Sequence, residues 1–315
     1  MKKIAILGHQ EITAILVEQL IDLNIEIVAL IGLCQKKSLN ISEFVDLQKL
    51  ASDNNIKQYY VDDYSLKSKE SIHLFRKESF DIVFVAGWSR LIPACLLSLI
   101  DTQFIGWHGG PFLPPRCRGR AVVNWAIINN ESDFFVYSML IDKGVDSGQI
   151  IETYCVSIQT DETAQSLYIK CAFAISQLFS NYILRHNKIS LTVQPSEGAT
   201  YLPKRSPEDG EIDWRLPANV ITRLVRALSE PFPHAWSKIH GKKLYLKRAR
   251  AIDIGIGNSY KNGQIVNILP GNELIIQTSN RLLLIEEYEY YDLSSLNRMD
   301  IFNDSKLIRN VTKVY

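Results

Sequence analysis

One histidine of this chain, His108, ends an apolar run and stands just before a loop with three arginines. The surrounding sequence is FIGWHGGPFLPPRCRGRAVVNWA, residues 104–126. Thirty-eight residues later, Asp146 lies in the turn LIDKGVDSGQII, which leads into another extended segment. A histidine with a carboxylate partner suits proton transfer, because imidazole titrates near neutral pH and the carboxylate fixes its tautomer or raises its pKa. These two residues are therefore the candidates for general acid–base chemistry.

The sequence indicates neither a protein nucleophile nor a metal centre beside this histidine. No serine or cysteine context is typical of a catalytic nucleophile, and no further cluster of His, Cys, Asp or Glu has metal-ligand spacing. The cysteines are scattered and form no CxxC pair: Cys34, Cys95, Cys117, Cys155 and Cys171. Unpaired thiols are typical of a reducing compartment, so we predict a cytoplasmic protein. The nucleophile is expected to belong to a substrate, and no metal is expected.

The elements that must position His108 have an α/β pattern. The first 160 residues alternate short apolar runs with helical patterns, which predicts a Rossmann-like, doubly wound and mostly parallel sheet. Strands are expected at 3–8, 26–32, 80–87 and 103–109, and helices at 12–23, 42–55 and 68–79. Ligands bind beyond the carboxyl ends of such strands, where His108 lies. The first strand is followed by GHQEIT, which lacks the three glycines of a dinucleotide fingerprint, so NAD is not expected.

A change of composition divides the chain into two parts. Residues 160–187 have the pattern of a long amphipathic helix that covers the sheet. Residues 195–217 are rich in proline, glycine and charge, which is typical of a linker. Short strands with turn signals follow, so we predict a smaller β-rich, OB-like unit. The predicted domains are 1–194 for catalysis, the linker, and 218–315.

Composition and charge restrict the partners. The 315 residues are 46% hydrophobic and 22% charged, as in ordinary globular proteins. The formal net charge is +1, so no whole-protein field attracts nucleic acid. No apolar run approaches the ~18 to 20 residues of a membrane span, and the first apolar run stops at Gly8, too early for a signal peptide. We expect neither a membrane nor a nucleic-acid partner.

Taken together, the motifs resemble the folate-dependent formyltransferase family. His108, PPRCRG at 114–119, the NWAIIN that follows and VDSGQII have the order of motifs in that family. RSPEDGEIDW at 205–214 and VRALSEPFPHAW at 225–236 are similar to the linker and domain joint of its two-domain members. The resemblance spans nearly the whole chain. It implies a Rossmann-like domain that binds 10-formyltetrahydrofolate and passes its formyl group to an amine without a metal.

The resemblance also implies roles for particular residues. Members of the family use an Asn-x-His motif and a distant Asp, and His108 and Asp146 match the last two. Their pterin lies in a pocket made largely of backbone from two loops. The positions of this chain that match those loops are Ser89, Arg90, Leu91, Ile92, Ile141, Asp142, Gly144 and Val145.

The chain departs from the family at one catalytic position, where Gly106 replaces the Asn of Asn-x-His. Positions 104, 106 and 108 share one face of a strand, so Phe104 does not supply the missing amide either. Loss of such an oxyanion donor typically costs ~10² to 10³ in rate. Two interpretations stay open. In the first, which we favour, the rebuilt GGPFLPP turn or Asn124 supplies the oxyanion donor. In the second, the protein binds its ligands but catalyses poorly or performs another reaction, such as formyl-folate hydrolysis.

The loop after His108 contains residues that indicate which molecule accepts the formyl group. Guanidinium groups beside a catalytic histidine suit a diphosphate, which they bind bidentately. The predicted substrate-binding residues are Arg116, Arg118, Gly119, Asn124 and Trp125. RAVVNW resembles members that formylate UDP- or dTDP-linked amino sugars, as in lipopolysaccharide or O-antigen biosynthesis. Residues 205–315 hold 16 Lys/Arg and 13 Asp/Glu, a balance that favours the sugar over the alternative, methionyl-tRNA. The β-rich unit could supply a homodimer interface.

Overall fold

The computed structural model describes residues 2–37, 44–185, 189–254 and 259–303. Contacts divide the chain into two compact units, which are described separately. The first unit comprises Met1–Val122, Ser132–Ser157 and Tyr168–Leu202, and the second comprises Val123–Glu131, Ile158–Leu167 and Pro203–Tyr315. The chain therefore passes between the units several times. The boundaries inferred from composition stay a prediction.

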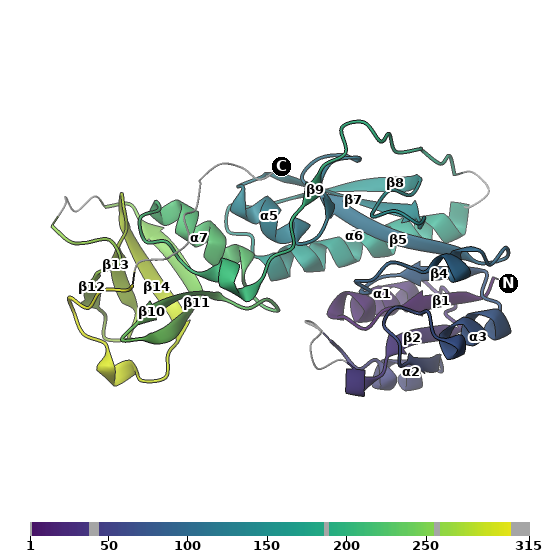
Figure 1. The fold of residues 1–315 in the computed structure, drawn as a ribbon, viewed down its shortest axis with the longest axis horizontal. Helices are drawn as coiled ribbons and strands as arrows, with labels where there is room; N and C mark the ends of the chain where they lie inside the picture. Colours follow the sequence, from purple (N-terminus) through teal and green to yellow (C-terminus); the bar gives the residue numbers. More distant parts are fainter. Residues whose placement is uncertain (1, 38–43, 186–188, 255–258, 304–315) are drawn as a thin grey trace. The chain divides into compact units, whose positions relative to one another are not determined.

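A seven-stranded sheet forms the centre of the first unit, in the order β3-β2-β1-β4-β5-β7-β8 (Figure 1). Its strands are β1 (Ile4–Leu7), β2 (Ala29–Leu33), β3 (Lys57–Val61), β4 (Ile82–Val85), β5 (Gln103–Gly110), β7 (Asp133–Leu140) and β8 (Ile150–Ser157). The first five strands of this set are parallel, and β7 is antiparallel to both of its neighbours, β5 and β8. The predicted doubly wound, mostly parallel sheet is confirmed. Strand order reverses between β1 and β4, which places the expected ligand edge at their carboxyl ends.

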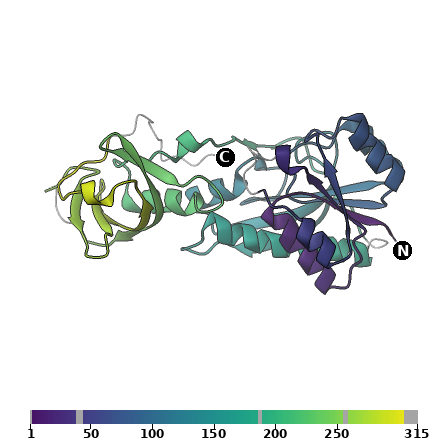
Figure 2. The same ribbon diagram turned by 90° about the horizontal axis from the view of Figure 1, so that it is seen from below.

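Helices cover both faces of this sheet. Figure 2 shows α1 (Glu11–Asp22, purple) and α6 (Ala164–Arg185, teal) on one face and α3 (Lys69–Glu78, blue) on the other. Phe179 of α6 stacks on Phe84 of β4, with ring centroids 4.1 Å apart and planes inclined by 9°. The expectation that the long helix covers the sheet is therefore correct. None of the described helices is long and apolar enough to cross a membrane.

The helix predicted at 42–55 is shorter than expected. The observed helix α2 covers only Gln48–Asp53, because Asp46 accepts a hydrogen bond from the Gln48 amide and Phe44 pairs with Gln10 as an isolated bridge. Residues 42 and 43 of that prediction lie outside the described residues, as do residues 186 and 187 of the predicted long helix. The remaining short elements are α4 (Ala94–Leu97) and 3₁₀ turns at Gln35–Lys37, Pro207–Gly210 and Leu293–Ser295.

The turn between β1 and α1 packs directly against the end of β4. A Cβ atom on Gly8 would lie 1.8 Å from the carbonyl oxygen of Ala86, so only glycine fits there. The hydroxyl of Thr13 donates a hydrogen bond of 2.7 Å to the same oxygen. The turn between β1 and α1 is therefore held close to the end of β4.

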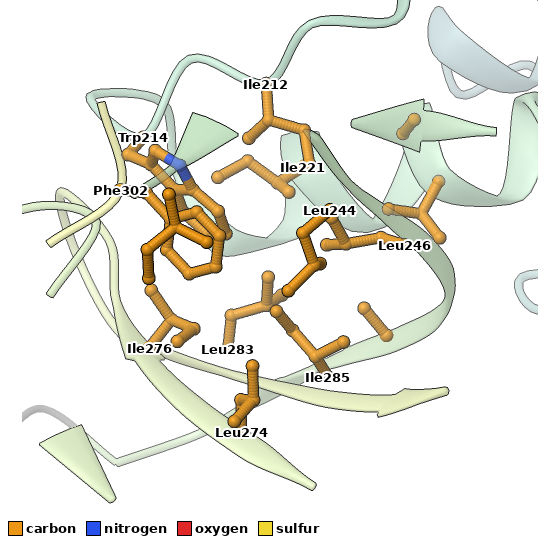
Figure 3. Close-up of a cluster of buried hydrophobic side chains, with 14 of the residues drawn as sticks. Ile212, Trp214, Ile221, Leu244, Leu246, Leu274, Ile276, Leu283, Ile285 and Phe302 are labelled. Carbon is orange, nitrogen blue, oxygen red and sulfur yellow. The ribbon is translucent and has the colours of Figure 1, made fainter. Parts of the chain in front are cut away.

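A five-stranded antiparallel sheet forms the second unit, in the order β10-β11-β14-β13-β12. Its elements are β10 (Ala235–Ile239), β11 (Lys242–Ile252), β12 (Ile265–Ile268), β13 (Leu274–Gln277), β14 (Leu282–Glu289) and the helices α5 (Val122–Ile128) and α7 (Ala218–Ala227). Figure 3 shows their apolar side chains converging beside Trp214 and Phe302, whose ring centroids are 5.0 Å apart. The indole N–H of Trp214 donates to Ser237 Oγ at 3.0 Å. The predicted β-rich second unit is confirmed.

His9, directly after β1, is a buried neutral histidine. Its side chain is 1% exposed, and its ring lies edge-on to Tyr64 and Trp88 with centroid distances of 5.2 and 5.0 Å. Neither ring nitrogen has a hydrogen-bond partner in the described part of the chain. Burial lowers the pKa of His9 from 6.5 to about 4. The unfolded chain therefore binds a proton at this ring at a higher pH than the folded chain does.

We expect the free energy of unfolding to fall as the pH drops from about 6.5 to about 4, because in this range the unfolded chain takes up a proton that folding must remove. The loss attributable to His9 is at most about 3 kcal/mol. Urea unfolding at neutral pH and near pH 5 measures it. His9→Leu should flatten the pH dependence, whereas His73→Leu, on the exposed surface of α3, should keep it. An unchanged slope in His9→Leu would contradict this assignment.

Candidate active site

His108 lies near the end of β5, with both ring nitrogens close to oxygen atoms. The residue is 8% exposed. Its Nε2 is 2.9 Å from the carbonyl oxygen of Cys117, and its Nδ1 is 3.6 Å from Oδ2 of Asp146. A doubly protonated ring can donate to the carbonyl and interact with the carboxylate at the same time. The structure thus brings the two predicted catalytic residues together, while their roles stay a prediction.

Asp146 is held by a tightly closed turn. Its φ is +50°, in the left-handed region, and its Oδ2 accepts a hydrogen bond of 2.9 Å from the Gly119 amide. A Cβ atom on Gly148 would lie 1.7 Å from the carbonyl oxygen of Leu140, so the turn requires glycine there. The side-chain amide of Gln194 donates to the carbonyl oxygens of Asp146 and Gly148 at 3.0 and 2.7 Å. The carboxylate is therefore positioned before any ligand binds.

Arg118 stabilises the turn of Asp146 through Gln194. It belongs to the short strand β6 (Arg118–Gly119), which pairs in parallel with β9 (Tyr201–Leu202), and it is only 4% exposed. Its guanidinium donates to Gln194 Oε1 at 2.8 Å and to the Tyr201 hydroxyl at 3.3 Å. Arg118 thus orients the same Gln194 that fixes the turn. Its predicted contact with a diphosphate, and that of Gly119, stay predictions.

A pocket opens beside Asp146 at the carboxyl ends of β4 and β5. The segments 85–92 and 139–148 line it together with Gly106 and Trp107. Six of the predicted folate-binding residues line this pocket: Arg90, Leu91, Ile92, Ile141, Asp142 and Gly144. Ser89 and Val145 belong to the same two loops but do not line it. Other residues that line the pocket were not predicted from the sequence, among them Trp88, Trp107, Met139 and Ser147.

The lining of this pocket combines aromatic side chains, glycines and polar groups. Its aromatic walls are Trp88 and Trp107, and its glycines leave room for close backbone approach. Asp142 is already engaged, since Gly144 N and Ser147 Oγ donate to its carboxylate at 2.9 and 2.8 Å. Among the described residues, no group of three or more His, Cys, Asp or Glu side chains is placed to hold a metal ion.

At position 106, the side chain of Ile141 occupies the space that a Cβ atom would need. A Cβ atom on Gly106 would lie 2.9 Å from Ile141 Cδ1 and 3.0 Å from Ile141 Cγ1. In the register of β5 and β7, Gly106 pairs with Met139 and His108 with Tyr137. The glycine is thus matched by a bulky apolar neighbour that also lines the pocket.

Two predicted substrate residues, Asn124 and Trp125, are engaged within the second unit. Asn124 is 2% exposed and its side-chain amide donates to the carbonyl oxygen of Ala227 at 2.6 Å. The indole N–H of Trp125 donates to the carbonyl oxygen of Pro203 at 3.0 Å, and the guanidinium of Arg205 lies 4.7 Å from its ring centroid. The Asn124 amide nitrogen therefore already has an acceptor, and its use as a replacement oxyanion donor stays a prediction.

Arg116, in the first unit, is the most accessible of the predicted substrate arginines. It is exposed, and its guanidinium lies 3.8 Å from the ring centroid of Phe112. A guanidinium stacked on a ring keeps its N–H donors available at its edge. Arg116 can therefore still bind an anion, whereas Arg118 already donates to protein acceptors.

Two family models match the chain. The model described as formyl transferase matches residues 2–183, and the model described as formyl transferase, C-terminal domain, matches residues 204–305. Together they cover the first-unit site and the β-rich second unit.

Individual relatives agree with these matches. The chain is 28% identical over 308 residues to the bifunctional polymyxin resistance protein ArnA of Wigglesworthia glossinidia brevipalpis, which covers 97% of this chain and 45% of that protein. It thus spans about half the length of that relative. It is 32% identical over 211 residues to a methionyl-tRNA formyltransferase of Caldanaerobacter subterraneus subsp. tengcongensis, 66% of each chain.

Among solved structures, the fold is similar to that of an N-formyltransferase from Helicobacter canadensis in complex with folinic acid and dTDP-3-aminofucose. The TM-score is 0.63 at 19% identity, covering 90% of this chain and 99% of that chain. Since the first family model by itself matches more than half of the residues, this chain belongs to the formyl transferase family.

Proposed function

We propose that this protein is an N-formyltransferase that moves the formyl group of 10-formyltetrahydrofolate to the amine of a nucleotide-linked amino sugar. The observation that carries the proposal is the pair of His108 and Asp146 beside a pocket lined by the two loops that match the folate-binding loops of the family. The solved relative that contains folinic acid has the same fold, which supports the choice of donor.

The proposed reaction uses only chemical groups of this chain and of its two substrates. The neutral amine attacks the formyl carbon, a C–N bond forms, and the carbonyl π electrons move to oxygen. Asp146 accepts the proton that the amine loses, and protonated His108 stabilises the negative oxygen. Collapse re-forms the carbonyl and breaks the bond to N10 of the folate, which takes up the proton that Asp146 accepted, so that the pair returns to its starting state. The products are the formamide and tetrahydrofolate.

Charge favours a sugar acceptor over a nucleic acid. The formal charge of +1 and the nearly balanced charges of residues 205–315 give no net positive field to attract an RNA backbone. Exposed Arg116 suits the diphosphate of a UDP- or dTDP-sugar. The solved relative with dTDP-3-aminofucose shows that this fold accepts such a substrate in another protein. A cytoplasmic location, a homodimer and a role in lipopolysaccharide or O-antigen biosynthesis belong to the same proposal.

Methionyl-tRNA is the second candidate acceptor, because one relative with 32% identity is a methionyl-tRNA formyltransferase. The two acceptors differ in their expected response to salt. Binding of tRNA falls steeply with ionic strength as counterions are released, whereas binding of a diphosphate sugar changes much less.

The acceptor can be identified by incubating the protein with 10-formyltetrahydrofolate and a panel of UDP- and dTDP-linked 3- and 4-amino sugars, alongside methionyl-tRNA. We expect the mass of one amino sugar to increase by one formyl group, and turnover to change little with moderate salt. Formylation of methionyl-tRNA alone would reject the sugar assignment. Release of formate without any formylated acceptor would indicate a hydrolase.

Substituting either member of the catalytic pair should abolish most of the turnover. For His108→Asn and Asp146→Asn we expect kcat to fall by ~10² to 10⁴, because each variant removes a proton-transfer group but keeps a side chain of similar size. Binding of a folate analogue should be retained. His73→Asn, on the exposed surface of α3, is the matched control. Near wild-type turnover in His108→Asn would refute the assignment.

Restoring the asparagine of the family should disturb this site. In Gly106→Asn the new Cβ would displace Ile141, which lines the pocket, so we expect KM for 10-formyltetrahydrofolate to rise. Gly106→Ala separates the effect of the Cβ atom from that of the amide. Combining Gly106→Asn with Ile141→Ala should relieve the crowding and restore KM. A tenfold or larger gain in kcat in that double variant would show that the native site lacks an oxyanion donor.

A further inference from the structure

The first loop of the pocket, residues 88–92, uses few of its backbone amides to hold itself in place. Among these amides, only that of Ser89 donates a hydrogen bond to another residue in the described part of the chain. The loop nevertheless lies close to the protein, since Trp88 and Ile92 are buried. A backbone amide without a protein acceptor is available to a ligand. The loop therefore needs support that leaves its other amides unused.

Tyr64 contacts three consecutive residues of this loop. Its hydroxyl oxygen accepts a hydrogen bond of 3.1 Å from the Ser89 amide. Its ring lies edge-on to that of Trp88, with centroids 4.8 Å apart, and the guanidinium carbon of Arg90 lies 5.4 Å from its ring centroid. Trp88 and Arg90 line the pocket, whereas Tyr64 does not. One side chain thus holds the loop without occupying the space for the ligand.

Tyr64 is itself placed by a hydrogen-bonded turn between β3 and α3. The carboxylate of Asp63 accepts hydrogen bonds from the amides of Ser65 and Ser68, both at 2.8 Å. Leu66, in the middle of the turn, has a φ of +58° and is 0% exposed. A side-chain acceptor thus closes this turn, and a buried side chain anchors it. The position of Tyr64 is therefore fixed by protein groups and does not require a ligand.

The loop has a second fixed point where it leaves β4. Gly87 has a φ of +77°, and a Cβ atom there would lie 2.4 Å from Thr13 Oγ1, so the backbone is held against α1. Two residues later, the hydroxyl of Tyr64 fixes the Ser89 amide. Trp88 lies between these two points, so its backbone has little freedom and its ring stays at the wall of the pocket.

We infer that Tyr64 is a positioning residue for folate binding, which holds the loop 88–92 in the conformation that binds the formyl donor. This inference rests on the proposed function. A loop that is ordered in advance loses less conformational entropy when the ligand binds, so Tyr64 increases the affinity. Its described contacts are with the loop and with His9, and not with the His108–Asp146 pair. Its effect should therefore be on binding of the donor and not on the chemical step.

Tyr64→Phe removes the hydroxyl and keeps the ring. We expect the Kd for folinic acid, measured by isothermal titration calorimetry, and the KM for 10-formyltetrahydrofolate to rise about fivefold, while kcat at saturating donor stays within about twofold. The thermal midpoint should change little, because Ser89 is exposed and water can replace the hydroxyl as acceptor. A purely structural role would lower the thermal midpoint without separating KM from kcat.

Tyr60→Phe is the matched control. Tyr60 lies on β3, four residues before Tyr64, and its hydroxyl donates a hydrogen bond of 3.0 Å to Asp46 Oδ1. The variant therefore also removes a hydrogen-bonded tyrosine hydroxyl, but one that contacts a residue outside the loop. It should keep the Kd for folinic acid, the KM and the kcat of the wild type.

Hydrogen exchange of the Ser89 amide, followed by NMR, tests the support of the loop without turnover. Tyr64→Phe should accelerate this exchange about tenfold, because the amide loses its acceptor, whereas Tyr60→Phe should leave it unchanged. An unchanged Kd for folinic acid in Tyr64→Phe would overturn the inference, and so would an unchanged exchange rate. Failure of the wild type to bind folinic acid would instead overturn the proposed donor, and the exchange rate would still decide whether Tyr64 holds the loop.

Discussion

The approach of Asp146 to His108 is the contact on which the rest of the site depends. His108 at the end of a strand and Asp146 in a turn 38 residues later are brought together, with 3.6 Å between His108 Nδ1 and Asp146 Oδ2. The turn cannot hold this position by itself, because Asp146 adopts a left-handed backbone conformation. Hydrogen bonds from Gly119 and Gln194 stabilise it, and Arg118 in turn orients Gln194. Buried donors and acceptors thus build a site that is ordered in advance of its substrates.

Gly106 stands where the resemblance to the family implies an asparagine, and its surroundings in this chain are apolar. Gly106 makes room for Ile141, whose side chain packs where a Cβ atom would otherwise lie. The space beside Gly106 is therefore lined by an apolar side chain that also lines the pocket. The group that replaces the amide of the family as an oxyanion donor stays a prediction.

Many parts of the fold could be predicted from local patterns. Apolar runs without charge mark β4 and β5 because strands buried on both faces need apolar side chains in succession. The helix at 68–79 was predicted to within one residue at each end, whereas the one at 42–55 was too long, because Phe44 pairs with Gln10 from another element. Strand β7 carries no comparable signal for its antiparallel pairing.

By itself, the sequence predicted most of the elements up to β5 and singled out His108 and Asp146 as candidates, because apolar periodicity and turn residues are local properties. The two loops that line the pocket were implied by the resemblance to the family. Only the tertiary structure decided that Arg118 is buried and donates to Gln194, and that Ile141 occupies the space at position 106. These facts arise from strand register and loop closure. Both join residues far apart in the chain, and no local pattern encodes such contacts.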